Sequence, residues 1–283
     1  MKNPFSRHPR NTANHTSSGL SLQTRVLVIL LSVSLVPVIA VALIGASQAR
    51  SALTNAAKSS LSAGAAQIAA ALDATIKSNL DSIRTEAQQH VFVEYLKLSP
   101  SERSTAGLKD SVRSELTILS LKEPTYILSY ALVDVNGVVL ADTVDANAGK
   151  SEKTDVYFSN VLNSQVPYMT PVTYKENGTL IVHFAAPVRD ETGGIVGILR
   201  SEYRAAMLQE LVGKSLQGVG QNITVTIFDD YNIRIVDSSE SKLVQKSLIP
   251  LSSDLFKTAV AEDAYHRALL QSNQQTIQVI TKH

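Results

Sequence analysis

The pattern of apolar and polar residues divides the chain into regions of different periodicity, and the first is an unbroken apolar run. Residues 26–46 contain no charged residue and are bracketed by Arg25 and Arg50. A helix of 21 residues spans about 31 Å, which matches the hydrocarbon core of a bilayer. The run is longer than the apolar core of about 7–15 residues in a signal peptide. We therefore predict an uncleaved transmembrane helix that tolerates Pro37 as a kink.

The charges that flank this run predict its orientation. More cations precede the run than follow it: Lys2, Arg7, Arg10 and Arg25 within residues 1–25, against Arg50 and Lys58 within residues 47–71. Because cations concentrate on the cytoplasmic side of membrane helices, we expect a single-pass protein of the cell membrane with residues 47–283 periplasmic or extracellular. Residues 1–25 are polar and lack periodicity, so we expect a disordered cytoplasmic tail.

Apolar residues then recur at helical spacing. The steps between them are seven, four, four, four and three residues, at Leu61, Ile68, Leu72, Ile76, Leu80 and Ile83. This stripe predicts a long stalk helix from residue 47 to about residue 95. The stripe can pack on the chain's own domain or on a second copy of the helix in a homodimer, and the sequence leaves both open. A second helix is expected at 108–121, so residues 47–122 are interpreted as stalk and linker helices.

From residue 126 the pattern becomes that of strands joined by turns. Strands are expected at 126–134, 138–143, 168–174, 180–188 and 195–203, with helices at 155–164 and 204–216. Asn136 and Gly137 form a strong turn signal between the first two strands. Consecutive strands joined by tight turns imply antiparallel pairing. The expected fold is therefore α+β, with a PAS-like antiparallel sheet lobe flanked by helices at residues 123–217.

A second unit at residues 218–283 repeats the opening of the first. Strands are expected at 223–228 and 233–237, a helix at 252–271 and a last strand at 275–281. The strands that would complete a second sheet do not follow within this sequence. We therefore expect an incomplete second PAS-like lobe, with its last strand as an exposed edge.

Composition and charge narrow the function. The net charge is +1, so no basic field favours a nucleic-acid partner. The chain has no cysteine, which excludes disulfides, thiolate metal sites and cysteine nucleophiles. The histidines lack metal-ligand spacing, and no nucleophile elbow or phosphate-binding loop is present. We expect no enzyme activity, no metal and no cofactor.

Residues 126–216 resemble a known family. The stretches that carry the likeness read YALVDVNGVVLADT, DVYFSNVL, VPYMTPVTY and GTLIVHFAAPVRDETGGIVGILRSEY. They resemble the double Cache domain, a PAS-like extracytoplasmic sensor of bacterial chemoreceptors, sensor histidine kinases and related cyclases. The resemblance implies a long helix, a membrane-distal lobe that binds a small molecule, a membrane-proximal lobe, a second membrane helix and a cytoplasmic output module. The last two have no counterpart in the sequence, so we expect the sensing half of a receptor.

The resemblance also implies a ligand site at Asp155, Tyr157, Phe158, Tyr168 and Glu202. Amino-acid-binding members carry an arginine where this chain has Asp155, and an acid near the position of Glu202 that receives the ligand amine. Without the arginine, the bidentate clamp for a carboxylate is lost. We therefore expect a neutral or cationic ligand. The aromatic residues can equally be core residues and the acids solvated, and the sequence leaves this open.

Two functions follow from this pattern. The first is a membrane-anchored sensor that binds a small molecule outside and signals across the membrane, in chemotaxis or in a two-component system. The alternative is a membrane-anchored binding or scaffolding protein without signalling output. Membrane lipid and a small-molecule ligand are the expected partners in both cases.

Overall fold

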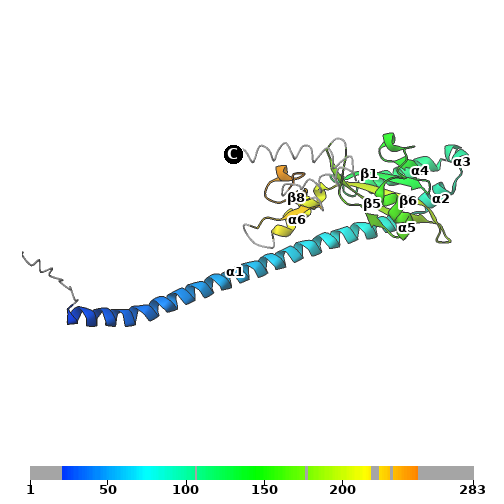
Figure 1. Cartoon of the computed structure of the whole chain (residues 1–283). Coiled ribbons are helices and arrows are strands. Elements are labelled where there is room, and N and C mark those ends of the chain that lie inside the picture. The colour runs from blue at the N-terminus through cyan, green and yellow to red at the C-terminus, as the bar shows by residue number, and fades with distance from the viewer. Residues whose placement is uncertain (1–20, 106, 176–177, 218–222, 230–231, 248–283) are drawn as a thin grey trace, which may run out of the picture. The chain divides into compact units, whose positions relative to one another are not determined.

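The computed structural model describes residues 21–105, 107–175, 178–217, 223–229 and 232–247 (Figure 1). The chain divides into two compact units, Met1–Ser62 and Ala63–His283, which are described separately. One helix, α1 (Leu22–Glu86), contains both the predicted transmembrane run and most of the predicted stalk. Its most apolar window has a mean hydropathy of 3.0 and is 0% buried. By length and composition this helix can cross a membrane.

Helix α1 ends earlier than the expected stalk, which was placed as far as residue 95. A turn separates α1 from α2 (His90–Lys97). Phe92 lies nine residues after Ile83, which on a continuous helix would place the two side chains about 180° apart. The turn brings both into one core, where Ile83 is 1% and Phe92 0% exposed. Two further helices follow, α3 (Pro100–Thr105) and α4 (Leu108–Ser120), the latter close to the prediction.

The apolar stripe of α1 has two parts. In the second unit, Ile68 and Ile83 are buried in the domain's own core, and the stripe residues between them pack against it. In the first unit, the first stripe residue, Leu61, is exposed. The stripe from Ile68 to Ile83 thus packs on the chain's own domain.

The sheet of the first lobe is antiparallel throughout. Its strands are β1 (Ile127–Asp134), β2 (Val139–Asp142), β3 (Tyr168–Met169), β4 (Thr173–Tyr174), β5 (Leu180–Arg189) and β6 (Ile195–Arg204). The order is β2-β1-β6-β5-β3, and β4 also pairs with β5. The expected strand at 168–174 is split into β3 and β4. Pro171 lies between them and has no N–H for a ladder, and Thr170 instead uses its Oγ1 to accept from the His183 N–H.

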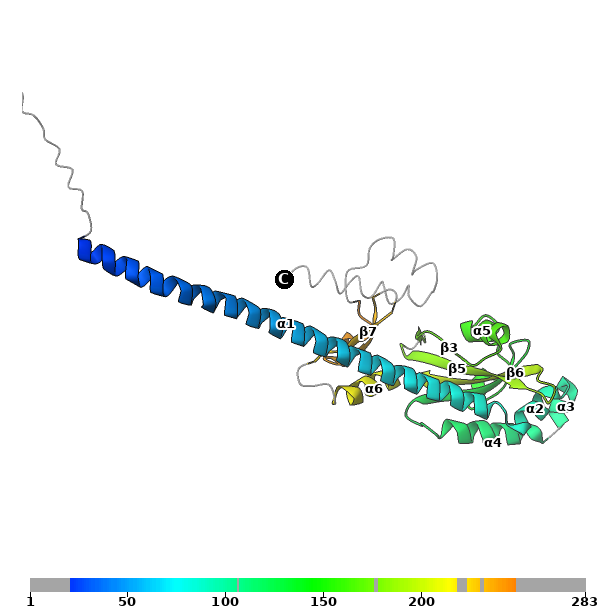
Figure 2. The same cartoon turned by 90° about the horizontal axis from the view of Figure 1, so that it is seen from below.

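Helices cover both faces of this sheet, as Figure 2 shows. Residues from α1, α2 and α4 pack with alternate residues of the strands in the larger core. Helix α5 (Val156–Ser164) packs on the opposite face with Ala131, Val133, Ala185 and Ile198. The predicted α+β architecture is confirmed. We call the face of the sheet that α5 covers the α5 face.

After the sheet, α6 (Ala206–Leu216) leads to the hairpin β7 (Thr226–Phe228) and β8 (Arg234–Asp237). Gln209 joins the helix to the hairpin, since its side chain donates to the Asp237 carbonyl at 2.8 Å and accepts from the Asp237 N–H at 3.0 Å. Two short 3-10 helices are η1 (Asp145–Asn147) and η2 (Ser241–Leu243). The expected helix at 252–271 and strand at 275–281 lie outside the described residues, so the incomplete second lobe stays a prediction.

Candidate ligand site on the α5 face

On the α5 face, the strand register places two charged residues opposite residues with small side chains. Ala131 of β1 and Ala185 of β5 lie opposite Arg200 of β6, and Ser129 of β1 lies opposite Glu202. Side chains alternate along a strand, so Arg200 and Glu202 emerge on the same face. Both are almost fully buried, at 1% and 5% exposure. The sheet surface beneath α5 therefore combines the buried Arg200 and Glu202 with small neighbouring side chains. We call this surface the charged floor.

Arg200 is fully engaged by groups of its own chain. Its Nη2 donates to Glu152 Oε1 at 2.6 Å and to Asp142 Oδ2 at 3.3 Å, and its Nη1 donates to Ser129 Oγ at 2.6 Å. Burial opposes the charge, but these carboxylates raise the pKa of Arg200 above its usual range. The acidic partners of Arg200 are therefore Glu152 and Asp142, and not Glu202, which lies two residues further along β6.

The loop that carries Glu152 is fastened to the β1–β2 turn. Gly137 in that turn has φ +85°, and its carbonyl accepts a 2.7 Å hydrogen bond from the Glu152 N–H. A Cβ on Gly137 would lie 2.7 Å from Lys153, so only glycine lets the loop approach this closely. The turn therefore positions Glu152 over Arg200.

Glu202 has different partners from those of Arg200. Its Oε1 accepts from Lys175 Nζ at 2.5 Å, and its Oε2 lies 3.4 Å from His183 Nε2. Burial by itself would raise the pKa of Glu202, but the hydrogen bonds with His183 and Lys175 outweigh it and lower that pKa to about 2. Glu202 is therefore ionised at neutral pH.

Asp155 precedes α5 as its N-cap residue, in an extended conformation. Its side chain makes no capping hydrogen bond, and among the described residues no hydrogen bond or ion pair reaches its carboxylate. The group is half-buried. Burial raises the pKa of Asp155, and the nearby charges of Glu152 and Glu202 raise it further. Within the described part of the chain, Asp155 is thus a carboxylate without a partner that lies beside the buried Arg200 and Glu202.

The three predicted aromatic residues lie in or against the core of the α5 face. Tyr157 is 0% exposed, its hydroxyl donates to Glu152, and its ring centroid lies 5.6 Å from that of His183. Phe158 is buried in the apolar cluster, and half-buried Tyr168 of β3 packs against that cluster. The structure therefore brings Asp155, Tyr157 and Glu202 to the charged floor, and places Phe158 and Tyr168 in the adjoining apolar cluster.

Sequence reasoning missed four residues of this site, namely Asp142, Glu152, Lys175 and His183. The imidazole ring of His183 lies beside Tyr157. Glu152 and Lys175 lie in loops without periodicity, so pattern gave no reason to single them out. Arg200, next to Glu202 on one strand face, was the one available signal that partners must exist, because a buried arginine needs acceptors. In the described ranges, no group of three or more His, Asp or Glu is placed to hold a metal ion.

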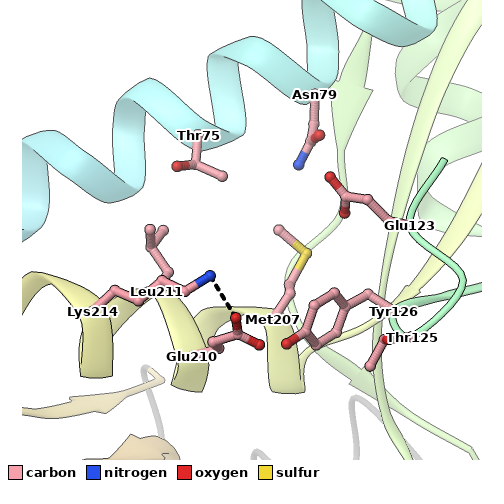
Figure 3. A pocket seen from close by; sticks show the side chains of 9 residues that line it. All are labelled: Thr75, Asn79, Glu123, Thr125, Tyr126, Met207, Glu210, Leu211 and Lys214. Carbon is pink, nitrogen blue, oxygen red and sulfur yellow. Dashed lines mark ion pairs between the residues drawn. The ribbon is translucent and has the colours of Figure 1, made fainter.

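Two cavities lie away from these residues. One is an open groove of about 240 Å³ lined by residues of α1, of the segment 123–126 and of α6, with an ion pair between Glu210 and Lys214 on its wall (Figure 3). Figure 3 also shows the Glu123 carboxylate pointing toward the Asn79 amide across this groove. The other, of about 420 Å³, lies between the turn at 178–180, α6 and the η2 region. Neither includes any of the five predicted site residues.

Comparison with known proteins decides the fold. No family model matches the chain, and no curated protein matches it. The sensor domain of the V. cholerae histidine kinase DctB covers 73% of this chain over 74% of its own length, with 15% identity and a TM-score of 0.55. The chain has the fold of a double Cache sensor domain. The resemblance found in residues 126–216 is confirmed at the level of fold.

Two chemoreceptor domains are also among the similar structures, with lower TM-scores. The ligand-binding domain of Campylobacter jejuni Tlp3, solved with L-valine, covers 62% of this chain and 68% of its own, with 18% identity and a TM-score of 0.46. That of Pseudomonas aeruginosa PAO1 PctC, solved with GABA, covers 65% and 74%, with 14% identity and a TM-score of 0.42. The first of these three structures is a sensor domain, and the other two are ligand-binding domains. The apolar N-terminal helix and this fold fit a single-pass membrane protein.

Proposed function

We propose that this chain is the extracytoplasmic sensing region of a membrane-anchored signalling protein. Helix α1 is long and apolar enough to span a bilayer, and the excess of cations before the apolar run supports a cytoplasmic N-terminus. The Cache fold is that of sensor domains in histidine kinases and chemoreceptors. On this proposal the first lobe, residues 123–217, receives the signal, and α1 connects it to the membrane.

The proposed signal is a small neutral or cationic molecule bound at Asp155, Tyr157, Phe158, Tyr168 and Glu202. The charge balance of the α5 face carries this proposal. Among the described residues of this face, four carboxylates meet two permanent cations, which leaves two negative charges in excess when His183 is neutral: Asp142, Glu152, Asp155 and Glu202 against Lys175 and Arg200. A ligand with positive charge offsets that excess, whereas a carboxylate ligand adds to it.

Binding beneath α5 can reach the rest of the molecule through the sheet. Strands β1, β5 and β6 carry the charged floor on one face and pack against α1, α2 and α4 on the other. A ligand that binds one arrangement of α5 and the sheet more tightly than another shifts the population toward it. Helix α1 is the element through which such a shift would pass toward the membrane.

We further propose that the lower part of α1 pairs with a second copy of the chain. Leu53 and Leu61 are 73% and 53% exposed, beyond the apolar run and before the part that packs on its own domain. Cysteine at Leu61 should form disulfide-linked dimers in membranes under mild oxidation, whereas cysteine at Ser60, on another face of the helix, should do so far less. Equal cross-linking at both positions would contradict a specific pairing.

Calorimetry on the full chain in nanodiscs tests the site. A panel of primary amines, quaternary ammonium ions and carboxylates should yield binders among the cations and neutral molecules. Removing a charged contact typically weakens binding about 10- to 150-fold, so Asp155→Ala should weaken the best binder by that factor. The unfolding temperature of the free protein should change little, since Asp155 has no described partner. Tight binding of a dicarboxylate that Asp155→Ala leaves unchanged would overturn the proposal.

A further inference from the structure

The ion pair between Lys175 and Glu202 joins two very different positions. Glu202 lies within β6, and its side chain is 6% exposed, whereas the Lys175 side chain is 41% exposed. Lys175 directly follows β4, and its backbone is held at a turn: its N–H donates to the Thr179 carbonyl at 2.9 Å, and its carbonyl accepts from the Gly178 N–H at 2.8 Å. A flexible cation from a surface turn therefore reaches a buried carboxylate on the rigid sheet.

Glu202 depends on this cation. A buried carboxylate is costly unless a cation or several hydrogen bonds compensate it. The other partner, His183, lies farther away, at 3.4 Å, and carries charge only when protonated. Lys175 is thus the permanent cation that balances Glu202. An ammonium group of a ligand would require the same carboxylate oxygens.

We propose that Lys175 is a tethered competitor of the ligand: its ammonium occupies the position on Glu202 that a ligand ammonium takes, so a cationic ligand binds by displacing it. This inference rests on the proposed function and narrows its ligand class to molecules with a cationic head group. A neutral molecule that displaced Lys175 would leave Glu202 without a permanent cation. The tether also sets affinity, because a ligand in solution competes with a cation held at high effective concentration.

Displacement has a route to the second lobe. The Gly178 carbonyl, in the turn that holds Lys175, accepts a 3.1 Å hydrogen bond from Gln245 Nε2. Gly178 and Leu180 also line the 420 Å³ cavity, together with residues of α6 and the η2 region. The turn is therefore held by two contacts, the Lys175–Glu202 ion pair and the hydrogen bond from Gln245 of the second lobe. A ligand that displaces Lys175 removes the first of them.

Chemical rescue tests the tether in the full chain. Lys175→Ala removes the ammonium and leaves space above Glu202, so the melting temperature should fall by about 3–10 °C. Ethylammonium chloride should restore much of that loss, whereas sodium chloride at equal ionic strength should not. Calorimetry should show ethylammonium binding to Lys175→Ala about 10- to 100-fold more tightly than to the wild type.

Two variants serve as controls. Lys97 is also 41% exposed, but its partner Glu191 is 68% exposed, so Lys97→Ala should lose little stability and gain nothing from ethylammonium. Lys175→Met keeps the aliphatic stem without the charge, so it should be destabilised yet not rescued, because the stem fills the space. If Lys175→Ala proves too unstable to purify, adding Glu202→Gln should restore folding and abolish amine binding.

The outcomes separate the inference from the proposed function. Equal ethylammonium stabilisation of the Lys175→Ala and Lys97→Ala variants, or of neither, overturns the tether. Rescue of Lys175→Ala without any cationic or neutral binder of the wild type supports the tether and contradicts the proposed function. A cationic ligand whose affinity is unchanged by Lys175→Ala supports the function and contradicts the tether.

Discussion

The two faces of the sheet bury contrasting sets of residues. The face toward α1, α2 and α4 is mainly apolar, with Leu132, Phe184 and Leu199 at 0–1% exposure. Its buried acid, Glu86, accepts from the Tyr130 hydroxyl at 2.8 Å and pairs with Lys122. The α5 face of the same sheet buries Arg200 and Glu202, both on β6. Buried charges contribute less to stability than apolar packing of the same volume, so the contrast supports our proposal that the α5 face serves ligand recognition and the other face serves stability.

The largest test of this contrast is Arg200→Met. The variant would leave Glu152 and Asp142 without their cation, and breaking a buried ion pair by removing one partner costs about 3–5 kcal/mol. Arg84→Met is a matched control, because Arg84 pairs with Asp81 on the exposed surface of α1, where such pairs contribute about 0–1 kcal/mol. Urea unfolding of both variants measures the difference. An equal loss of unfolding free energy in the two variants would contradict a buried ion pair of Arg200 with Glu152 and Asp142.

Stability should depend on pH through Glu202. Its pKa is lowered in the folded state to about 2 from the ordinary value of 4.5. A lowered pKa contributes stability that is fully present above the ordinary value and is lost as pH falls toward the folded value. The free-energy advantage of wild type over Glu202→Gln should therefore shrink between about pH 4.5 and pH 2. Urea unfolding across that range checks this, and a constant difference would contradict the ionised, paired state of Glu202.

A smaller effect is expected where the α5 face is fastened to the β1–β2 turn. Gly137 and Gly149 both have φ +85°, but only a Cβ at Gly137 meets another residue within 4 Å. Alanine at either position carries the strain of positive φ, of about 1–2 kcal/mol. Gly137→Ala should lose additional stability because Lys153, next to Glu152, must move. Thermal unfolding of the two variants isolates that contact, and equal melting temperatures would show that the loop adjusts freely.

Local pattern predicted much of the fold. The strands β1, β5 and β6 and helix α4 agree with expectation within a few residues, because apolar alternation and turn residues act within short stretches. The sequence analysis missed the break after Glu86. On a continuous helix Phe92 would point away from Ile83, but this reveals a turn only when both residues are known to lie in one core. The split between β3 and β4 could have been expected from Pro171.

The candidate site was harder to predict than the fold. The resemblance predicted Asp155, Tyr157 and Glu202 as site residues, and the contacts of Glu202 and of the neighbouring Arg200 come from distant parts of the chain. Lys175 is 27 residues from Glu202, and Glu152 is 48 residues from Arg200. Such pairs are set by strand order and loop packing, which no local pattern encodes.

A crystal structure of the full chain with its tightest-binding primary amine tests the central claim most directly. The account predicts the ammonium between Asp155 and Glu202, Lys175 withdrawn from Glu202, and Arg200 still bound to Glu152 and Asp142. A ligand in the groove between α1 and α6 shown in Figure 3, with the Lys175–Glu202 pair intact, would contradict it.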